Sequence, residues 1–306
     1  MAAGGEVLRR ALEGRVAIVT GAGRGLGRAY AMALASEGAA VVVNDLGGDL
    51  GGHGVDEAPA QAVKREIEEA GGKAVVSGHD VGDWSAAGKL VALAVETFGG
   101  LDILVNNAGI LRDRLFANMP EDDWDAVIRV HLKGHAAPAH HAMAWWRQRS
   151  KAGASVAASI VHTTSLAGLI GNFGQANYAS AKLAVVGLSH TLAREGARYG
   201  VRSNAISPSA RTRIEESLQP APEGSFDVFD PGNVAPLVCW LARADCPASG
   251  QVFQAYGDRI EVLAPAAIAA DLRNGERWTP DAIAKALDGR LPATPTLADF
   301  VPELGE

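Results

Sequence analysis

The sequence has few cysteines and no long apolar run. Its only cysteines among 306 residues are Cys239 and Cys246, too few for a disulfide framework or a cysteine-rich zinc site, so a reducing compartment is expected. No stretch approaches the roughly 18 apolar residues that span a bilayer. Residues 1–14 lack the continuous apolar core of a signal peptide. We therefore expect no membrane association and a cytoplasmic location.

Basic residues are in the minority. The chain has 28 lysines and arginines against 35 acidic residues, a formal net charge of −7, and it contains no cluster of five basic residues. Proteins that bind nucleic acid usually present a basic patch or stripe. Binding to DNA or RNA is therefore not expected.

Glycine, in contrast, is abundant. The 36 glycines make up about 12% of the chain, whereas average usage is about 7%. Proline contributes only 14 residues, so the glycines do not belong to a low-complexity linker. Their positions should therefore carry information about turns and close approaches of the backbone.

Short β-branched runs alternate with segments of helical period. Strands that are apolar on both faces and separated by helices predict a parallel sheet covered on both sides, hence an α/β fold of the doubly wound Rossmann type. Residues 1–256 are interpreted as one domain. The predicted strands are 16–20, 40–44, 73–77, 102–106, 158–163 and 201–206.

Residues 257–306 are predicted to form an ordered C-terminal extension, packed on the same domain or on a partner subunit. The pattern predicts a short strand over 259–263 and an alanine-rich helix over 265–272. A further helix is expected after Thr279, with Thr279 as its N-cap and Pro280 at its first position.

The first predicted strand runs into the glycine-rich turn TGAGRGLG at 20–27, and a helix follows. Such a turn lets the backbone approach a pyrophosphate, and the helix N-terminus offers free N–H groups. The positions expected to bind a dinucleotide are Gly21, Arg24, Gly25, Leu26 and Gly27. A tight turn without a ligand is the alternative, because the spacing departs from GxGxxG.

Asp45 follows the second strand, eighteen residues after Gly27. A carboxylate there accepts hydrogen bonds from the adenosine ribose and repels a 2′-phosphate, which favours NAD over NADP. Arg24 argues for NADP, because a guanidinium pairs with phosphate. The alternative is that Asp45 has no contact with a cofactor and only caps the turn that follows. The glycine cluster at 47–54 is either a cover over the cofactor or a long surface loop.

Tyr178 and Lys182 lie four residues apart in a helical segment and therefore share a face. A free phenol has a pKa near 10, and a lysine charge about 4 Å away would lower that pKa enough for Tyr178 to act as an acid or base near neutral pH. Ser165 follows the fifth strand, at the sheet edge where ligands bind. These three residues are the predicted catalytic set.

With TGAGRGLG at 20–27, NNAG at 106–109, Ser165 and YxxxK at 178–182, the chain resembles the short-chain dehydrogenase/reductase family over residues of about 15–256. The resemblance implies that Lys182 also binds the nicotinamide ribose and that Tyr178 borders it. The remaining residues assigned in this way to the adenosine half are Asp80, Val81, Asn107, Ala108 and Gly109.

Longer stretches narrow the resemblance. The segments at 41–49, 106–114, 130–134 and 171–178 are similar to the (3R)-hydroxyacyl-CoA dehydrogenase units of type 2 peroxisomal multifunctional enzymes and to their stand-alone bacterial relatives. The resemblance implies NAD-dependent interconversion of a (3R)-3-hydroxyacyl-CoA and a 3-ketoacyl-CoA. It also implies a homodimer or homotetramer that associates through long helices over 121–150 and 176–199.

Two positions depart from the broad family. His131 stands where most members have a catalytic asparagine, and a water relay is expected to run through His131 and the backbone. Pro208 is followed by Ser209 instead of glycine. Pro208 is still expected to contact the cofactor, and Thr212 is the candidate for binding the nicotinamide amide. The segment 213–230 is expected to be the substrate lid.

Other functions were weighed against this one. A steroid or other secondary-alcohol dehydrogenase would use the same residues, and a dinucleotide-binding scaffold without turnover would fit the two departures. A metal site is not expected: His131 and His135 have helical metal-site spacing, but no HExxH or nearby cysteine completes a ligand set.

Overall fold

The computed structural model describes residues 10–212, 224–264, 266, 268–293 and 295–304. Its centre is an eight-stranded sheet with the order β3-β2-β1-β4-β5-β6-β7-β8, in which every neighbouring pair is parallel except β7 and β8. The strands are β1 Val16–Thr20, β2 Ala40–Asn44, β3 Lys73–Ser77, β4 Ile103–Asn106, β5 Ala158–Thr163, β6 Val201–Pro208, β7 Val252–Tyr256 and β8 Arg259–Leu263.

The predicted doubly wound fold is confirmed. Five of the six predicted core strands begin at the predicted residue, β4 begins one residue later, and β6 continues to Pro208. β7 was not predicted, because its run VFQAY is interrupted by the polar but fully buried Gln254. β8 occurs at its predicted residues and pairs antiparallel with β7.

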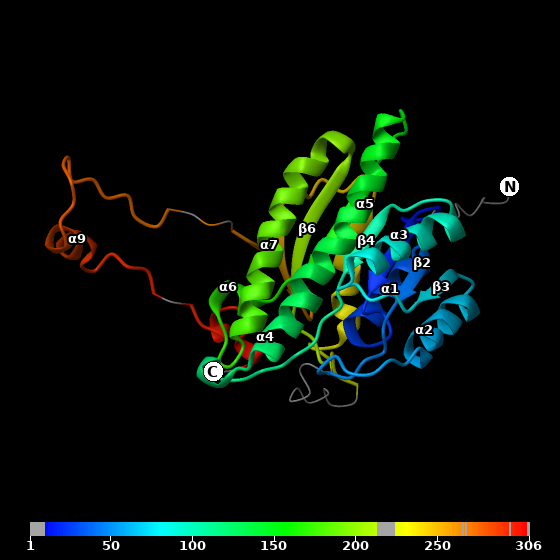
Figure 1. Ribbon diagram of the computed structural model, residues 1–306, viewed down its shortest axis with the longest axis horizontal. Helices are drawn as coiled ribbons and strands as arrows, with labels where there is room; N and C mark the ends of the chain where they lie inside the picture. Colours follow the sequence, from blue (N-terminus) through cyan, green and yellow to red (C-terminus); the bar gives the residue numbers. More distant parts are fainter. Residues whose placement is uncertain (1–9, 213–223, 265, 267, 294, 305–306) are drawn as a thin grey trace.

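Helices cover both faces of the sheet (Figure 1). α1, α2 and α8 share one apolar core with one face, and α3, α5 and α7 pack on the other. No helix in the described ranges is long and apolar enough to cross a membrane. The α-helices are α1 Gly25–Ser36, α2 Ala58–Glu69, α3 Trp84–Phe98, α4 Glu121–Ile128, α5 Gly134–Lys151, α6 Leu166–Ile170, α7 Ala176–Gly196, α8 Ala235–Ala242 and α9 Pro280–Leu287.

The helix predicted over 121–150 has a different form in the structure. α4 passes into a π-helical segment, η2 Arg129–Lys133, before α5 begins. π-helical turns are wider than α-helical ones and occur often at functional sites. This segment carries His131, whose side chain is buried.

Of the two helices predicted in the C-terminal extension, the structure contains one. α9 has its expected N-cap, since Thr279 Oγ1 accepts a hydrogen bond from Ala282 N at 3.2 Å. The helix predicted over 265–272 is wrong, because its described residues are not helical. A helix of that length needs an apolar surface to pack on, whereas Ile268 is 86% exposed.

The end of the chain returns to the sheet domain. Two short 3-10 helices, η5 Leu297–Asp299 and η6 Pro302–Leu304, flank the buried Val301. Val301 packs with Leu166 and Tyr256, and Tyr256 Oη donates to Glu303 Oε2 at 3.2 Å. Figure 1 shows α9 standing away from the sheet domain between these contacts and β8.

Candidate active site

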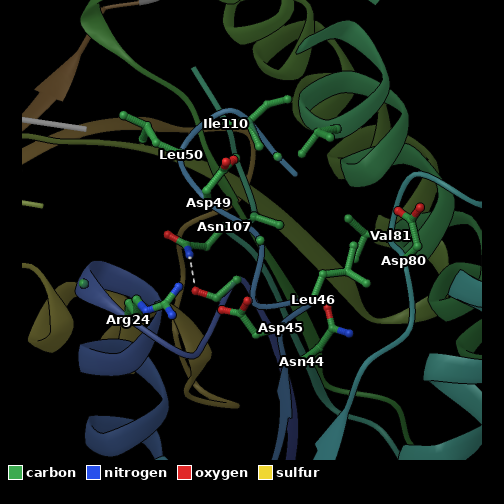
Figure 2. A pocket seen from close by; sticks show the side chains of 18 of the residues that line it. Arg24, Asn44, Asp45, Leu46, Asp49, Leu50, Asp80, Val81, Asn107 and Ile110 are labelled. Atoms are coloured by element: carbon green, nitrogen blue, oxygen red, sulfur yellow. Dashed lines mark hydrogen bonds between the residues drawn. The ribbon is translucent and has the colours of Figure 1, made fainter. Parts of the chain in front are cut away.

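A cavity of about 400 Å³ lies at the carboxyl ends of β1, β2 and β4 (Figure 2). The strand order reverses between β1 and β4, and such a switch point is where open α/β sheets bind their ligands. Of the residues predicted to bind the cofactor, those that line this cavity are Gly21, Arg24, Gly25, Leu26, Gly27, Asp45, Asp80, Val81, Asn107, Ala108, Gly109 and Thr212.

The glycine turn is too tightly packed for side chains. Gly21 and Gly25 have φ values of +64° and +51°, which other residues rarely adopt. A Cβ on Gly27 would lie 2.0 Å from Gly21 O. Sequence reasoning passed over Gly23, where a Cβ would lie 2.8 Å from Asp45 Oδ2. The signal for Gly23 was present in the run of alternating glycines.

Asp45 joins two loops at the cavity. Its Oδ2 accepts a hydrogen bond from Gly23 N at 2.7 Å, and its Oδ1 accepts one from Gly47 N at 2.6 Å. The carboxylate therefore caps the turn that follows β2 and also fixes the glycine turn. Arg24 lies on the same wall, with its Nη2 3.9 Å from Asp56 Oδ2.

The side-chain amide of Asn107 stabilises the glycine turn through hydrogen bonds to its backbone. Its Nδ2 donates to Thr20 O at 3.0 Å. It also donates to Gly21 O at 3.2 Å (Figure 2). At the far end of the cavity, Asp80 forms an ion pair with Arg129 and also accepts a hydrogen bond from Gly82 N at 2.8 Å. The polar groups of this wall are thus held by protein partners.

The predicted catalytic residues lie at the carboxyl end of β5 and in α7. Ser165 is the N-cap of α6, and its Oγ accepts a hydrogen bond from Ala167 N at 3.2 Å. α6 packs closely on α7, since a Cβ on Gly168 would lie 2.7 Å from Leu183 N. The Nζ of Lys182 lies 5.5 Å from the centroid of the Tyr178 ring.

Lys182 is almost fully buried. Its Nζ donates to Thr163 O at 2.6 Å, and burial lowers the pKa of Lys182 to about 7. The charged form is therefore costly to keep inside the fold, and the Thr163 carbonyl stabilises it.

His131 packs edge-on against Tyr178, with ring centroids 5.0 Å apart. Its Nε2 lies 2.8 Å from Ile110 O and 3.1 Å from Ile110 N. Gly109 makes room for the ring, because a Cβ there would lie 2.5 Å from His131 Cε1. Burial, and secondarily the charge of Lys182, holds the pKa of His131 well below its usual range.

Two further histidines lie in the same interior. The rings of His135 and His162 stack with centroids 5.5 Å apart, and burial followed by the Lys182 charge lowers both pKa values, that of His162 to about 3. Sequence reasoning did not place His162 there. Within the described ranges, no three histidine, cysteine or acidic side chains are arranged to hold a metal ion. Buried polar atoms of this interior without a described hydrogen-bond partner are Asn106 Oδ1, His131 Nδ1, His135 Nδ1 and Nε2, His162 Nε2 and Thr163 Oγ1.

The remaining predicted residues lie beside the sheet edge. Pro208 ends β6 and pairs with Ala255, outside the cavity lining, whereas Thr212 reaches the cavity opposite Gly25. Of the expected lid over 213–230, residues 213–223 lie outside the described residues.

Comparisons with known proteins agree with this architecture. A family model described as short chain dehydrogenase matches residues 15–222. The chain is 44% identical over 285 residues to the hydroxyacyl-CoA dehydrogenase ChsB1 of Mycobacterium tuberculosis, covering 90% of this chain and 88% of that protein. A crystal structure of a short chain dehydrogenase from Mycobacterium avium has a TM-score of 0.84 and 48% identity, covering 93% of this chain and 98% of that one.

A longer relative matches through one part of its length. The chain is 46% identical over 242 residues to the mouse peroxisomal multifunctional enzyme type 2, an alignment that covers 79% of this chain and 31% of the mouse protein. The family model, which matches well over half of the chain, and the near full-length relatives lead to one conclusion. The protein belongs to the short-chain dehydrogenase family and is an oxidoreductase that acts on a CH–OH group.

Proposed function

We propose that the protein is an NAD-dependent dehydrogenase that interconverts a (3R)-3-hydroxyacyl-CoA and the corresponding 3-ketoacyl-CoA. The observation that carries the proposal is Lys182, buried beside the Tyr178 ring with its Nζ on the Thr163 carbonyl. The similarity to ChsB1, a hydroxyacyl-CoA dehydrogenase that the chain matches over most of its length, supports an acyl-CoA substrate.

The residues present fit a dinucleotide. Gly21, Gly25 and Gly27 line the cavity without side chains, so a ligand can approach their backbone closely, and the N-terminus of α1 opens onto the same space. The turn would hold the pyrophosphate, Asp45 the adenosine ribose, Asp80 and Val81 the adenine, and Thr212 the nicotinamide amide. The bound dinucleotide would supply the hydride acceptor.

We infer that the cofactor is NAD because of the charges around the ribose position. Asp45 would meet a 2′-phosphate with a carboxylate, and Arg24 is already oriented toward Asp56. Steady-state rates with each dinucleotide test this inference, and equal kcat/KM for NAD and NADP would contradict it.

In the chemical step, Tyr178 Oη would take the proton of the substrate hydroxyl while Ser165 Oγ holds the same oxygen. Lys182 would stabilise the phenolate and would also bind the nicotinamide ribose. His131 would orient Tyr178 through the edge-on ring contact. Its low pKa keeps His131 neutral, so it would act by packing and hydrogen bonding.

Replacing Tyr178 tests the mechanism. The Tyr178→Phe variant should keep NADH binding within about twofold and lose turnover by about 10²- to 10⁴-fold, the usual contribution of a general acid or base. Tyr199→Phe, a tyrosine outside the site, serves as the matched control. Turnover of Tyr178→Phe close to that of the wild type would contradict the proposed role.

A panel of secondary alcohols, including sterols, should be assayed beside the acyl-CoA substrates. The expected result is a kcat/KM at least about tenfold higher for the (3R)-3-hydroxyacyl-CoA. Faster oxidation of a sterol would favour the steroid dehydrogenase alternative, and binding of NAD without turnover of any substrate would favour a scaffold.

A further inference from the structure

The loop between β2 and α2, residues 47–55, forms one wall of the cavity, and six of its residues line it. The loop leaves and rejoins the fold at one narrow neck, where Asp56 N donates to Leu46 O at 3.0 Å. Gly47 has a φ of +74°, and a Cβ there would lie 1.7 Å from Asp56 O. The neck is therefore fixed beside Asp45.

The rest of the loop has little apolar anchoring. Five of its nine residues are glycine, and Val55 is 75% exposed. At Gly52 the loop passes close to Ile110, which a Cβ on Gly52 would approach to 3.1 Å. Because glycine-rich chain loses much conformational entropy when it is ordered, polar contacts have to hold this loop over the cavity.

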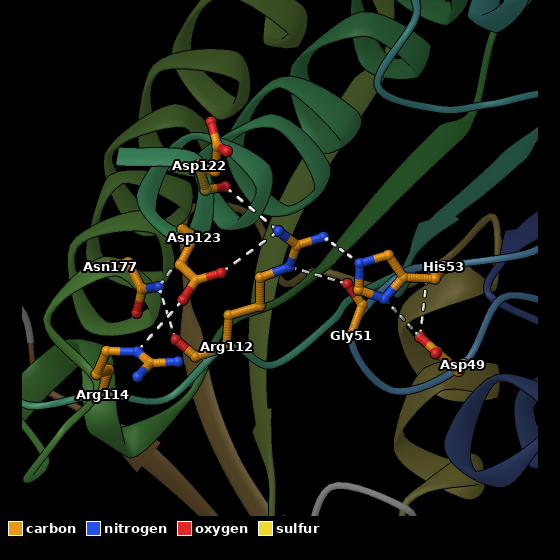
Figure 3. A network of polar contacts seen from close by, with 8 residues as sticks. All are labelled: Asp49, Gly51, His53, Arg112, Arg114, Asp122, Asp123 and Asn177. Atoms are coloured by element: carbon orange, nitrogen blue, oxygen red, sulfur yellow. Dashed lines mark hydrogen bonds and ion pairs between the residues drawn. The ribbon is translucent and has the colours of Figure 1, made fainter. Parts of the chain in front are cut away.

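Those contacts come from the segment that follows β4 (Figure 3). Arg112 Nε donates to Gly51 O at 3.0 Å, and Arg112 Nη2 lies 3.2 Å from His53 Nε2. Since arginine can only donate, His53 Nε2 is the acceptor of this hydrogen bond. A backbone hydrogen bond from Leu111 N to Leu50 O, at 3.0 Å, also connects this segment to the loop.

The other side of Arg112 is held by α4 and by α7, the helix that carries Tyr178 and Lys182. Arg112 Nη1 lies 3.4 Å from Asp123 Oδ1 of α4. Asn177 of α7 is fully buried, and its Nδ2 donates to Arg112 O at 3.1 Å and to Asp123 O at 3.2 Å. Asn177 Oδ1 accepts a hydrogen bond from Tyr178 N at 2.8 Å. Arg112 therefore connects the loop to the start of the catalytic helix.

We propose that Arg112 is a positioning residue that keeps loop 47–55 closed over the bound dinucleotide, so that its contacts with Gly51 and His53 set the rate at which the dinucleotide leaves. The proposal rests on the proposed function only in that the cavity binds NAD(H). The loop would have to swing outward about its neck for release, and the Arg112 contacts would break in that motion.

The test measures NADH binding and release directly in the full-length protein, by fluorescence titration and by stopped-flow displacement with excess NAD. Arg112→Gln should raise the dissociation rate constant and the Kd of NADH by about tenfold and leave the association rate constant within about twofold. His53→Ala should raise the dissociation rate constant by about threefold, because it removes the Nε2 contact with Arg112 and, inside the loop, the Nδ1 contact with Asp49.

The chain offers a matched control in Arg114. Arg114 Nε lies 3.5 Å from Asp123 Oδ2, but no contact described for its side chain reaches the loop. Arg114→Gln should leave NADH release within about twofold of the wild type. If Arg112→Gln does not fold, His53→Ala still decides, because the His53 side chain is 69% exposed.

The outcomes separate this proposal from the proposed function. A wild-type protein that binds no NADH overturns both. A wild-type protein that binds NADH, with unchanged release in Arg112→Gln or in His53→Ala, overturns the role of Arg112 alone. Faster release in Arg114→Gln to the same extent as in Arg112→Gln would also overturn it, because a general effect on the Asp123 region would then explain the result.

Discussion

The two halves of the site are built differently. On the cavity wall, the Asp45 carboxylate and the Asn107 amide nitrogen form hydrogen bonds with backbone groups of neighbouring segments. In the interior behind Tyr178, Lys182 and three histidines are buried, and several of their ring nitrogens have no described partner. Backbone geometry therefore defines the proposed cofactor side, whereas desolvation defines the proposed catalytic interior. The first half should be sensitive to added volume and the second to pH.

The largest expected effect comes from adding one methyl group on the cavity side. In Gly27→Ala the new Cβ would meet Gly21 O at 2.0 Å, so the turn must open. We expect loss of measurable NADH binding and a loss of unfolding free energy of about 1–3 kcal/mol, measured by titration and urea denaturation.

Gly187→Ala is the matched control for this variant. Gly187 lies on α7, and a Cβ there would meet nothing within 4 Å. Alanine should stabilise the exposed helical position by about 0.5–1 kcal/mol. Equal losses in the two variants would contradict the account of the turn.

The second expected effect is a pH dependence of stability that comes from the buried Lys182 in the interior and not from the cavity wall. Because the pKa of Lys182 is lowered from 10.5 to about 7, the unfolded chain binds more protons than the native state between these values. The unfolding free energy should therefore rise by about 2 kcal/mol from pH 7 to pH 9. Lys182→Met should abolish this rise in urea unfolding, and an unchanged rise in the variant would show that another group causes it.

A smaller effect is expected on the acid side. His131, His135 and His162 have lowered pKa values, so they stay neutral in the native state while the unfolded chain takes up protons below pH 6.5. Each of these histidines should lower the unfolding free energy by up to about 1.4 kcal/mol for every unit that the pH falls below 6.5. In urea unfolding, His162→Leu should reduce the slope of the unfolding free energy between pH 6.5 and 5.0, and an unchanged slope would show that other groups cause it.

The same contrast explains what the sequence could predict. The valine-rich strands, the glycine turn and the Tyr178 to Lys182 spacing are local patterns, and the structure contains the predicted elements around them. The π-helical segment at His131, the burial of His162 and the bonds from Arg112 to Gly51 depend on residues far apart in the sequence. The wrong helix over 265–272 had a helical composition but no surface to pack on.

The central claim is that the Ser165, Tyr178 and Lys182 site oxidises a (3R)-3-hydroxyacyl-CoA with NAD. The most direct measurement is the rise in NADH absorbance with purified protein, (3R)-3-hydroxyacyl-CoAs of several chain lengths, their (3S) enantiomers, and either NAD or NADP. We predict turnover with the (3R) substrates and NAD that disappears in Tyr178→Phe. An active Tyr178→Phe variant, or a wild-type protein that binds NAD and oxidises none of these substrates, would contradict the claim.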